Sequence, residues 1–160
     1  MTPVDQAVIG QALLSAAREM GIKLYRSAYS PVVRDGKDAS TGILDARGQA
    51  VAQSDELIPI LVGSLSITFN ACAERYPIET LREGDFYICN HPYFGAHHLQ
   101  DILIFVPIFH HGELLGFSAA VAHHLDIGGG APGMNTSATD YFQEGLVIPP
   151  SKYNLQADWD

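Results

Sequence analysis

Two apolar runs joined by a short polar segment constrain the fold of this chain more than any other feature. The runs are residues 102–109 (ILIFVPIF) and 114–121 (LLGFSAAV), and residues 110–113 (HHGE) lie between them. Apolar runs with β-branched and aromatic residues, separated by a few polar residues that include glycine, predict a β-hairpin. We therefore expect an antiparallel sheet built around this hairpin.

The hairpin brings together the polar residues that flank its two outer ends. With the turn at residues 110–113, the segment holding His98 and Asp101 lies opposite residues 122–125. Cross-strand neighbours have Cβ atoms about 5 Å apart, so these side chains are expected to meet. Successive side chains of a strand point to opposite faces, so only one of His123 and His124 should join them.

Imidazole and carboxylate are ligands that Zn²⁺, Mn²⁺ and Fe²⁺ accept, so the cluster is a candidate metal site. A fourth ligand would come from Asp38 or Asp126. An ion there would polarise a carbonyl group or lower the pKa of a bound water to about 7. The remaining histidine and carboxylate would orient the ligands or act as a general base. The alternative is that His98 and Asp101 form an ordinary hydrogen-bonded loop pair, but two converging histidine and aspartate segments favour metal binding.

Composition limits the partners and the compartment of the chain. The 160 residues have no composition shift, so residues 1–160 are expected to form a single domain. A net charge of −9 argues against nucleic acid and anionic membranes as partners. No apolar run reaches the roughly 18 residues of a membrane span, and the N-terminus does not read as a signal peptide. Cys72 and Cys89 lack C-x-x-C spacing and are expected to be buried thiols, so a cytoplasmic location is expected.

The remaining elements complete an α+β fold. Thr2-Pro3 opens a helix, as N-cap and first helical residue, and Ser30-Pro31 ends it. A small hairpin is expected around the turn at residues 45–48, and a second amphipathic helix runs from Leu61 to Tyr76. We expect two helices packed on a largely antiparallel sheet, with the metal site at one end of the long hairpin. Residues after Gly130 have no strong periodicity, and no further strand is expected there.

Three other features have simple alternatives. Pro107 within the first apolar run indicates an edge position or a bulge. Gly128-Gly129-Gly130 would form a concavity for an anion or a tight turn, and no nucleotide-binding fingerprint surrounds it. Cys89 is a candidate nucleophile beside the histidines, although a core thiol is the simpler interpretation.

The motifs around the hairpin resemble those of the hydantoinase B/oxoprolinase family. The family pattern is close to NDPY-x-GGTH-x-x-D, then AHH-x-DIGG-x-x-PG, then EG-x-x-IPP. Here the three motifs are residues 90–101, 122–133 and 144–150. The upstream segments RSAYSPVVRDGKDAS and DARGQAVAQ are similar to further family motifs, so the resemblance covers nearly the whole chain in order.

The resemblance implies a ligand set. His98, Asp101 and His124 would bind a divalent metal (Zn, Mn or Fe), with Asp38 as the fourth ligand. The remaining residues of the cluster, His123 and Asp126, would then be the catalytic candidates.

The resemblance also implies a function. The chain would be the metal-binding subunit of an ATP-dependent hydrolase of cyclic amides (hydantoin, oxoproline or lactam). It would act in a hetero-oligomer with an actin-like A-type ATPase subunit that binds the ATP. The alternatives are a subunit of an ATP-dependent ketone carboxylase, of the acetone or acetophenone type, and a non-catalytic assembly subunit.

The chain departs from the family pattern in three ways. His91 replaces the Asp of NDPY, and Ala96-His97 replaces Gly-Thr before His98. The chain is also much shorter than family subunits and resembles only their N-terminal portion.

Overall fold

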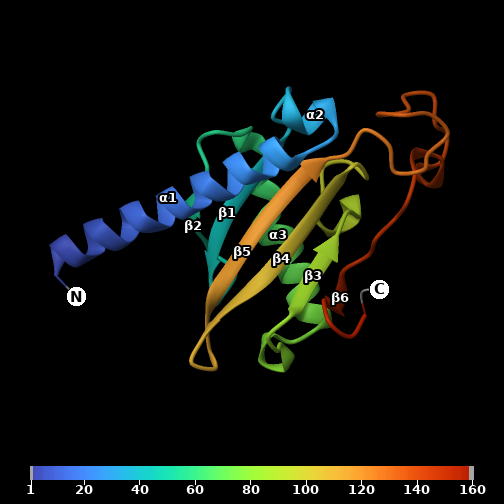
Figure 1. Ribbon diagram of the computed structural model, residues 1–160. Helices are drawn as coiled ribbons and strands as arrows, with labels where there is room; N and C mark the ends of the chain where they lie inside the picture. The colour runs from blue at the N-terminus through green and yellow to red at the C-terminus, as the bar shows by residue number, and fades with distance from the viewer. Residues whose placement is uncertain (1, 159–160) are drawn as a thin grey trace.

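The structure, a computed structural model, describes residues 2–158 of the chain. Its centre is a six-stranded sheet with the order β2-β1-β5-β4-β3-β6, in which every neighbouring pair is antiparallel (Figure 1). The strands are β1 (Ala39–Asp45), β2 (Ala50–Gln53), β3 (Asp85–Cys89), β4 (Asp101–His110), β5 (Glu113–His123) and β6 (Ser151–Asn154). The helices are α1 (Pro3–Ser27), α2 (Pro31–Arg34) and α3 (Val62–Arg75), and the short 3₁₀ turns are η1 (Pro59–Leu61), η2 (Ile78–Thr80), η3 (Pro92–Phe94) and η4 (Tyr141–Glu144).

The predicted long hairpin is confirmed as β4 and β5. Its turn residues His111 and Gly112 both have positive φ, 51° and 82°, as a two-residue turn that follows the strand twist requires. The pairing register shifts by one residue between Ile108 and Phe109, so Leu115 has no partner on β4. This shift is a β-bulge, and it decides which side chains of the two strands share a face.

Pro107 sits next to this bulge. β4 is an inner strand, but it pairs with β3 only as far as Phe105. The backbone of Pro107 therefore needs no hydrogen bond on that side, which is where a strand tolerates proline.

Helix α3 covers one face of the sheet and forms the main core with it (Figure 1). Phe69 is fully buried at the centre, and its ring contacts those of Tyr87, Phe105 and Phe117 at centroid distances of 5.9, 5.5 and 4.5 Å. The helix was predicted from its amphipathic spacing and lies within one residue of the predicted limits.

Helix α1 crosses the opposite face of the sheet, over β1 and β2. Thr2 and Asp5 form the capping box at its start, as the N-cap prediction requires. Only its C-terminal half packs on the sheet. There the Thr41 hydroxyl donates to the Ala17 carbonyl at 2.9 Å, and a Cβ on Gly21 would lie only 2.9 Å from the Ser54 hydroxyl. The predicted α+β fold, with helices on an antiparallel sheet, is thus confirmed.

The single-turn helix α2 and the edge strand β6 were not expected from the sequence. β6 pairs with β3, and the buried Asp85 of β3 also binds two side chains of β6. The Asp85 carboxylate accepts hydrogen bonds from the Arg82 backbone at 2.9 Å and the Asn154 amide at 2.8 Å, and it contacts Lys152 Nζ at 3.3 Å. Burial alone would raise the pKa of Asp85, but these bonds hold it below the ordinary value. Between residues 2 and 158, no helix combines the length and the apolar composition that crossing a membrane would take.

We predict a pH-dependent loss of stability for Asp85→Asn. Because folding lowers the pKa of Asp85, its charge stabilises the fold fully above the unfolded pKa of about 4, and this contribution is lost as pH falls through the lower pKa of the folded state. The variant should lose about 1–2 kcal/mol of unfolding free energy at pH 7, and much less near about pH 2. Urea unfolding at both pH values measures this. Glu74→Gln, at an exposed position of α3, is the control and should change stability by less than about 0.5 kcal/mol. An equal loss for Asp85→Asn at both pH values would contradict the prediction.

Candidate metal centre

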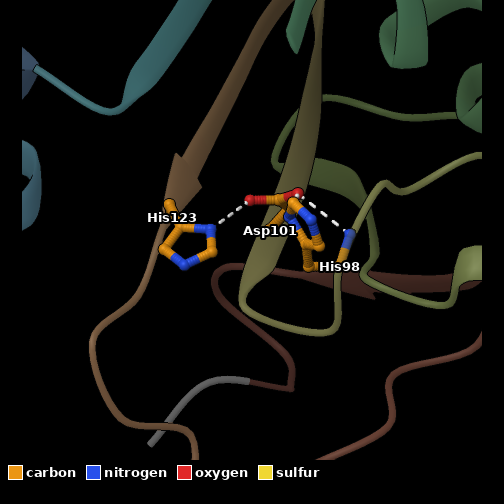
Figure 2. Close-up of side chains that lie close together, drawn as sticks. All are labelled: His98, Asp101 and His123. Atoms are coloured by element: carbon orange, nitrogen blue, oxygen red, sulfur yellow. Dashed lines mark hydrogen bonds and ion pairs between the residues drawn. The ribbon is translucent and has the colours of Figure 1, made fainter. Parts of the chain in front are cut away.

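Asp101 is the hub of a His–Asp–His cluster at the open end of the β4–β5 hairpin. It is the first residue of β4 and lies directly across from His123, the last residue of β5. The Asp101 carboxylate is 1% exposed, and its Oδ1 lies 2.7 Å from Nδ1 of His123 (Figure 2). The hairpin therefore supplies two of the three side chains by direct cross-strand pairing.

His98 reaches the same carboxylate from the loop before β4. Its backbone N–H donates to Asp101 Oδ2 at 3.0 Å, and its ring Nδ1 lies 3.1 Å from that oxygen. The Asp101 backbone N–H donates in turn to the His98 carbonyl at 3.1 Å, which closes the H-x-x-D segment into a turn. Figure 2 shows the Asp101 carboxylate between His123 and the loop segment that carries His98.

This donor set fits a divalent metal ion. One ligand atom from each of His98, Asp101 and His123 can be chosen so that all three lie within 4.8 Å of one another. Two imidazoles and a carboxylate are a ligand set that Zn²⁺ and related ions accept. The side chain of His123 is 11% exposed and that of His98 is 45% exposed, so the site is closed on the β5 side and open to solvent at His98.

Neighbouring charges within the cluster shift the pKa values of Asp101 and His123. Burial would raise the pKa of Asp101, but the hydrogen bond and charge of His123 and the charge of His98 lower it overall. The pKa of His123 is raised, chiefly by its hydrogen bond to Asp101. The buried carboxylate is therefore anionic, and it holds its histidines in place.

His124 does not face this cluster. Its backbone N–H donates to the Gln100 carbonyl at 2.8 Å, and its side chain lines a groove on the other face of the sheet, with Ile102 and Ala122. Desolvation there lowers the pKa of His124. The bulge at Leu115 is the reason why His124 points away from Asp101. Without the one-residue shift, Asp101 would pair with residue 122, and His124 would share its face. The sequence left the choice between the two histidines open, and the resemblance assigned the ligand to His124, whereas the structure brings His123 to Asp101.

The other predicted site residues, Asp38 and Asp126, are not part of the cluster. The Asp38 carbonyl accepts a hydrogen bond from the His123 backbone N–H at 3.0 Å, and the Asp38 charge contributes to the raised pKa of His123. The Asp126 carboxylate is exposed and accepts from the Gly128 backbone N–H at 2.8 Å, closing a local turn. Asp38 is thus next to the site, and Asp126 begins the loop that leaves it.

The glycine run and the unusual histidines also have defined places. A Cβ on Gly129 would lie 2.5 Å from the Glu144 carbonyl, and the Gly130 backbone N–H donates to the Gln143 carbonyl at 2.8 Å. The glycines therefore allow close packing of the loop, as the tight-turn interpretation expects. His91 Nδ1 accepts from the Tyr93 backbone N–H, and His97 is exposed, its ring centroid 6.5 Å from that of His98.

Asn90 organises the site, a role that sequence reasoning did not assign to it. It is fully buried at the end of β3, and its amide donates to the carbonyls of Leu99 (2.6 Å) and Leu146 (2.7 Å). Its Oδ1 accepts from the Ile148 backbone N–H at 2.6 Å. Asn90 thus joins the turn that carries His98 to the returning C-terminal segment. The available signal was a polar residue directly after a buried strand, at the head of the site motif.

We predict that Asn90→Ala destabilises the protein by about 2–4 kcal/mol, because two carbonyls and one N–H group lose their buried partner. Thermal or urea unfolding measures this. Asn70→Ala, at an exposed position of α3, is the matched control and should change stability by less than about 0.5 kcal/mol. Equal stability of the Asn90→Ala variant and the wild type would show that these bonds contribute nothing net.

Comparisons with a family model and with known sequences point to the same protein family. A family model described as hydantoinase B/oxoprolinase matches residues 2–156. An uncharacterized protein of Methanocaldococcus jannaschii is 38% identical over 155 residues, covering 95% of this chain and 27% of the relative. The β subunit of caprolactamase from Pseudomonas jessenii is 34% identical over 151 residues, covering 94% of this chain and 26% of the relative.

The fold of this chain is also similar to that of two solved structures. The nucleotide-free structure of acetone carboxylase, from work on ATP-dependent acetone carboxylation, matches with a TM-score of 0.84 and 25% identity, over 99% of this chain and 21% of that one. The ATP-dependent caprolactamase of Pseudomonas jessenii matches with a TM-score of 0.78 and 29% identity, over 99% of this chain and 27% of that one. This chain spans about a quarter of the length of these proteins.

Proposed function

The chain belongs to the hydantoinase B/oxoprolinase family, and on that premise we propose that it is the metal-binding part of an ATP-dependent enzyme that hydrolyses cyclic amides. The observation that carries this proposal is the buried Asp101 carboxylate between His98 and His123. Hydantoinase and caprolactamase subunits among its relatives support amide substrates.

In this proposal His98, Asp101 and His123 hold a Zn, Mn or Fe ion, and His123 takes the ligand position first assigned to His124. A bound divalent ion supplies Lewis-acid polarisation of an amide carbonyl or activation of water. Asp38, whose backbone is tied to His123, is retained as the fourth ligand. The exposed side at His98 is where a substrate would approach.

The chain's other residues orient this set. Asn90 and the backbone bonds of the H-x-x-D turn hold His98 against the carboxylate. Asp126, at the start of the loop beyond the site, is proposed as the proton-transfer residue because it is exposed and on the route out of β5. His124 is proposed to stay outside the reaction, on the opposite face.

The proposed assembly follows the relatives. We propose an A-type ATPase subunit as the partner that binds ATP, since the solved relatives are ATP-dependent. The free, buried thiols Cys72 and Cys89 suit a reducing compartment, which supports a cytoplasmic location.

Ketone carboxylation is the second candidate reaction. It is kept because an acetone carboxylase is among the solved structures that this chain resembles over 99% of its length. Incubation of the reconstituted enzyme with labelled bicarbonate and a ketone separates the two, because only a carboxylase fixes the label. A non-catalytic assembly role is the third candidate, and it predicts a chain that binds no metal.

The test is elemental analysis of the purified chain and of single-site variants. We expect close to one Zn, Mn or Fe ion per chain in the wild type. His98→Ala, Asp101→Ala and His123→Ala should lower metal affinity at least about 10–100-fold, since each removes a ligand. His97→Ala and His124→Ala are matched controls that should keep the metal.

Each other outcome has a definite meaning. Metal lost in His124→Ala but kept in His123→Ala would return the ligand role to His124. A folded wild-type chain without metal would remove the proposed site and favour the assembly role. Circular dichroism of every variant separates metal loss from unfolding.

A further inference from the structure

The N-terminal half of α1 is an apolar helix that this chain leaves uncovered. Figure 1 shows α1 projecting beyond the edge of the sheet toward the N-terminus. Residues 2–12 are all exposed, and among them Val4, Val8 and Ile9 are 70%, 63% and 49% exposed. A Cβ on Gly10 would meet no atom within 4 Å. The first three turns of the helix thus receive no tertiary packing.

The sequence of this half is that of a buried helix. Between Asp5 and Arg18 there is no charged residue, and only Gln6, Gln11 and Ser15 are polar. Successive helical residues lie about 100° apart around the axis. The pairs Val8-Ile9 and Leu13-Leu14 therefore place apolar side chains on several sides of the helix. A helix that is apolar nearly all round is found inside a larger protein body.

The solvent-accessible surface of the whole chain also indicates that part of it is covered in a larger protein body. A folded monomer of 17.3 kDa is expected to expose about 7,800 Å², whereas this chain exposes 9329 Å². The excess, about 1,500 Å², exceeds the roughly 800 Å² that each partner contributes to a standard interface, and it is in the range of obligate ones.

A second uncovered apolar surface lies at the other end of α1. A groove of about 430 Å³ runs between its C-terminal turn and the sheet, lined by apolar residues that include Leu24, Ala28, Ile102, Ile104 and Ala120. In the described part of the chain, no helix covers β3 and β4 on this side (Figure 1). Both ends of α1 therefore carry apolar surface that no described residue covers.

We infer that α1 is a docking helix, and that its occupant is the polypeptide that family members carry beyond the quarter this chain spans. The relatives are about four times as long as the matched region. A second copy of this chain is the weaker choice, because pairing two such helices would leave the far sides of both in water. A transient ATPase partner is also disfavoured, since obligate interfaces are the more hydrophobic class. The inference does not depend on the metal site.

The test mixes this chain with a separately produced polypeptide, the part of the Methanocaldococcus jannaschii relative beyond the region matched here, once circular dichroism and thermal unfolding have shown that this polypeptide is folded. Light scattering on a sizing column and titration by calorimetry measure assembly. We expect the wild-type chain to be monomeric alone and to form a 1:1 complex with this polypeptide. Ile9→Lys should weaken the complex at least tenfold, whereas Glu74→Lys, at an exposed position of α3, should not.

Two controls separate docking from folding and from metal binding. Both variants should keep the melting temperature of the isolated chain, because both positions are exposed. Both should also keep its metal content. A homodimer of the chain that Ile9→Lys dissociates would show a second copy to be the occupant. No complex with the folded wild type, or equal affinity for both variants, would overturn the inference.

Discussion

The register of the β4–β5 hairpin is the constraint on which the sheet, the core and the site all depend. These strands lie at the centre of the sheet, with β1 paired to β5 and β3 paired to β4. In this register Leu103, Phe105, Phe117 and Val121 are buried in one core under α3. The same parity turns Asp101 and His123 to one face, because side chains alternate along both strands. A slip of one residue would expose the core side chains, so the burial of the core also protects the geometry of the site.

Buried polar residues then attach the irregular segments to this centre. Asn90 links the end of β3 to the turn before β4 and to residues 146–148. Asp85 does the same for β6 at the edge of the sheet. Each has hydrogen-bond partners from more than one segment, which is what makes burial of an amide or a carboxylate tolerable. The long loop between β5 and β6 is thus held at its return by a few specific bonds rather than by a large apolar core.

Helices cover the two faces of the sheet to different extents. The α3 face has a closed core centred on Phe69, whereas the α1 face is covered only over β1 and β2. A chain that spans about a quarter of its relatives and exposes more surface than its mass predicts is consistent with this asymmetry. The candidate metal site lies at the end of the complete face, so its three side chains are in place even though the other face is open.

The sequence by itself determined the local elements and the residue types that gather at the candidate site. Periodicity and capping residues predicted α1 and α3, the apolar runs predicted β4 and β5, and the H-x-x-D spacing predicted that His98 and Asp101 meet. These features depend on residues close together in the chain. The short strand β6 has no such signal, because its pairing with β3 depends on a return of the chain from far away in sequence.

Only the tertiary structure decided between His123 and His124. Alternation along a strand allows one of two adjacent histidines to face Asp101, but which one depends on the pairing register. That register is set by a turn with two positive φ angles and by the unpaired Leu115, a one-residue irregularity that no periodic pattern in the sequence marks. The placement of Asp38 beside His123 likewise follows from the pairing of β1 with β5, which joins segments about eighty residues apart in the chain. Local patterns specify elements, whereas register is fixed by the packing of the whole sheet against α3.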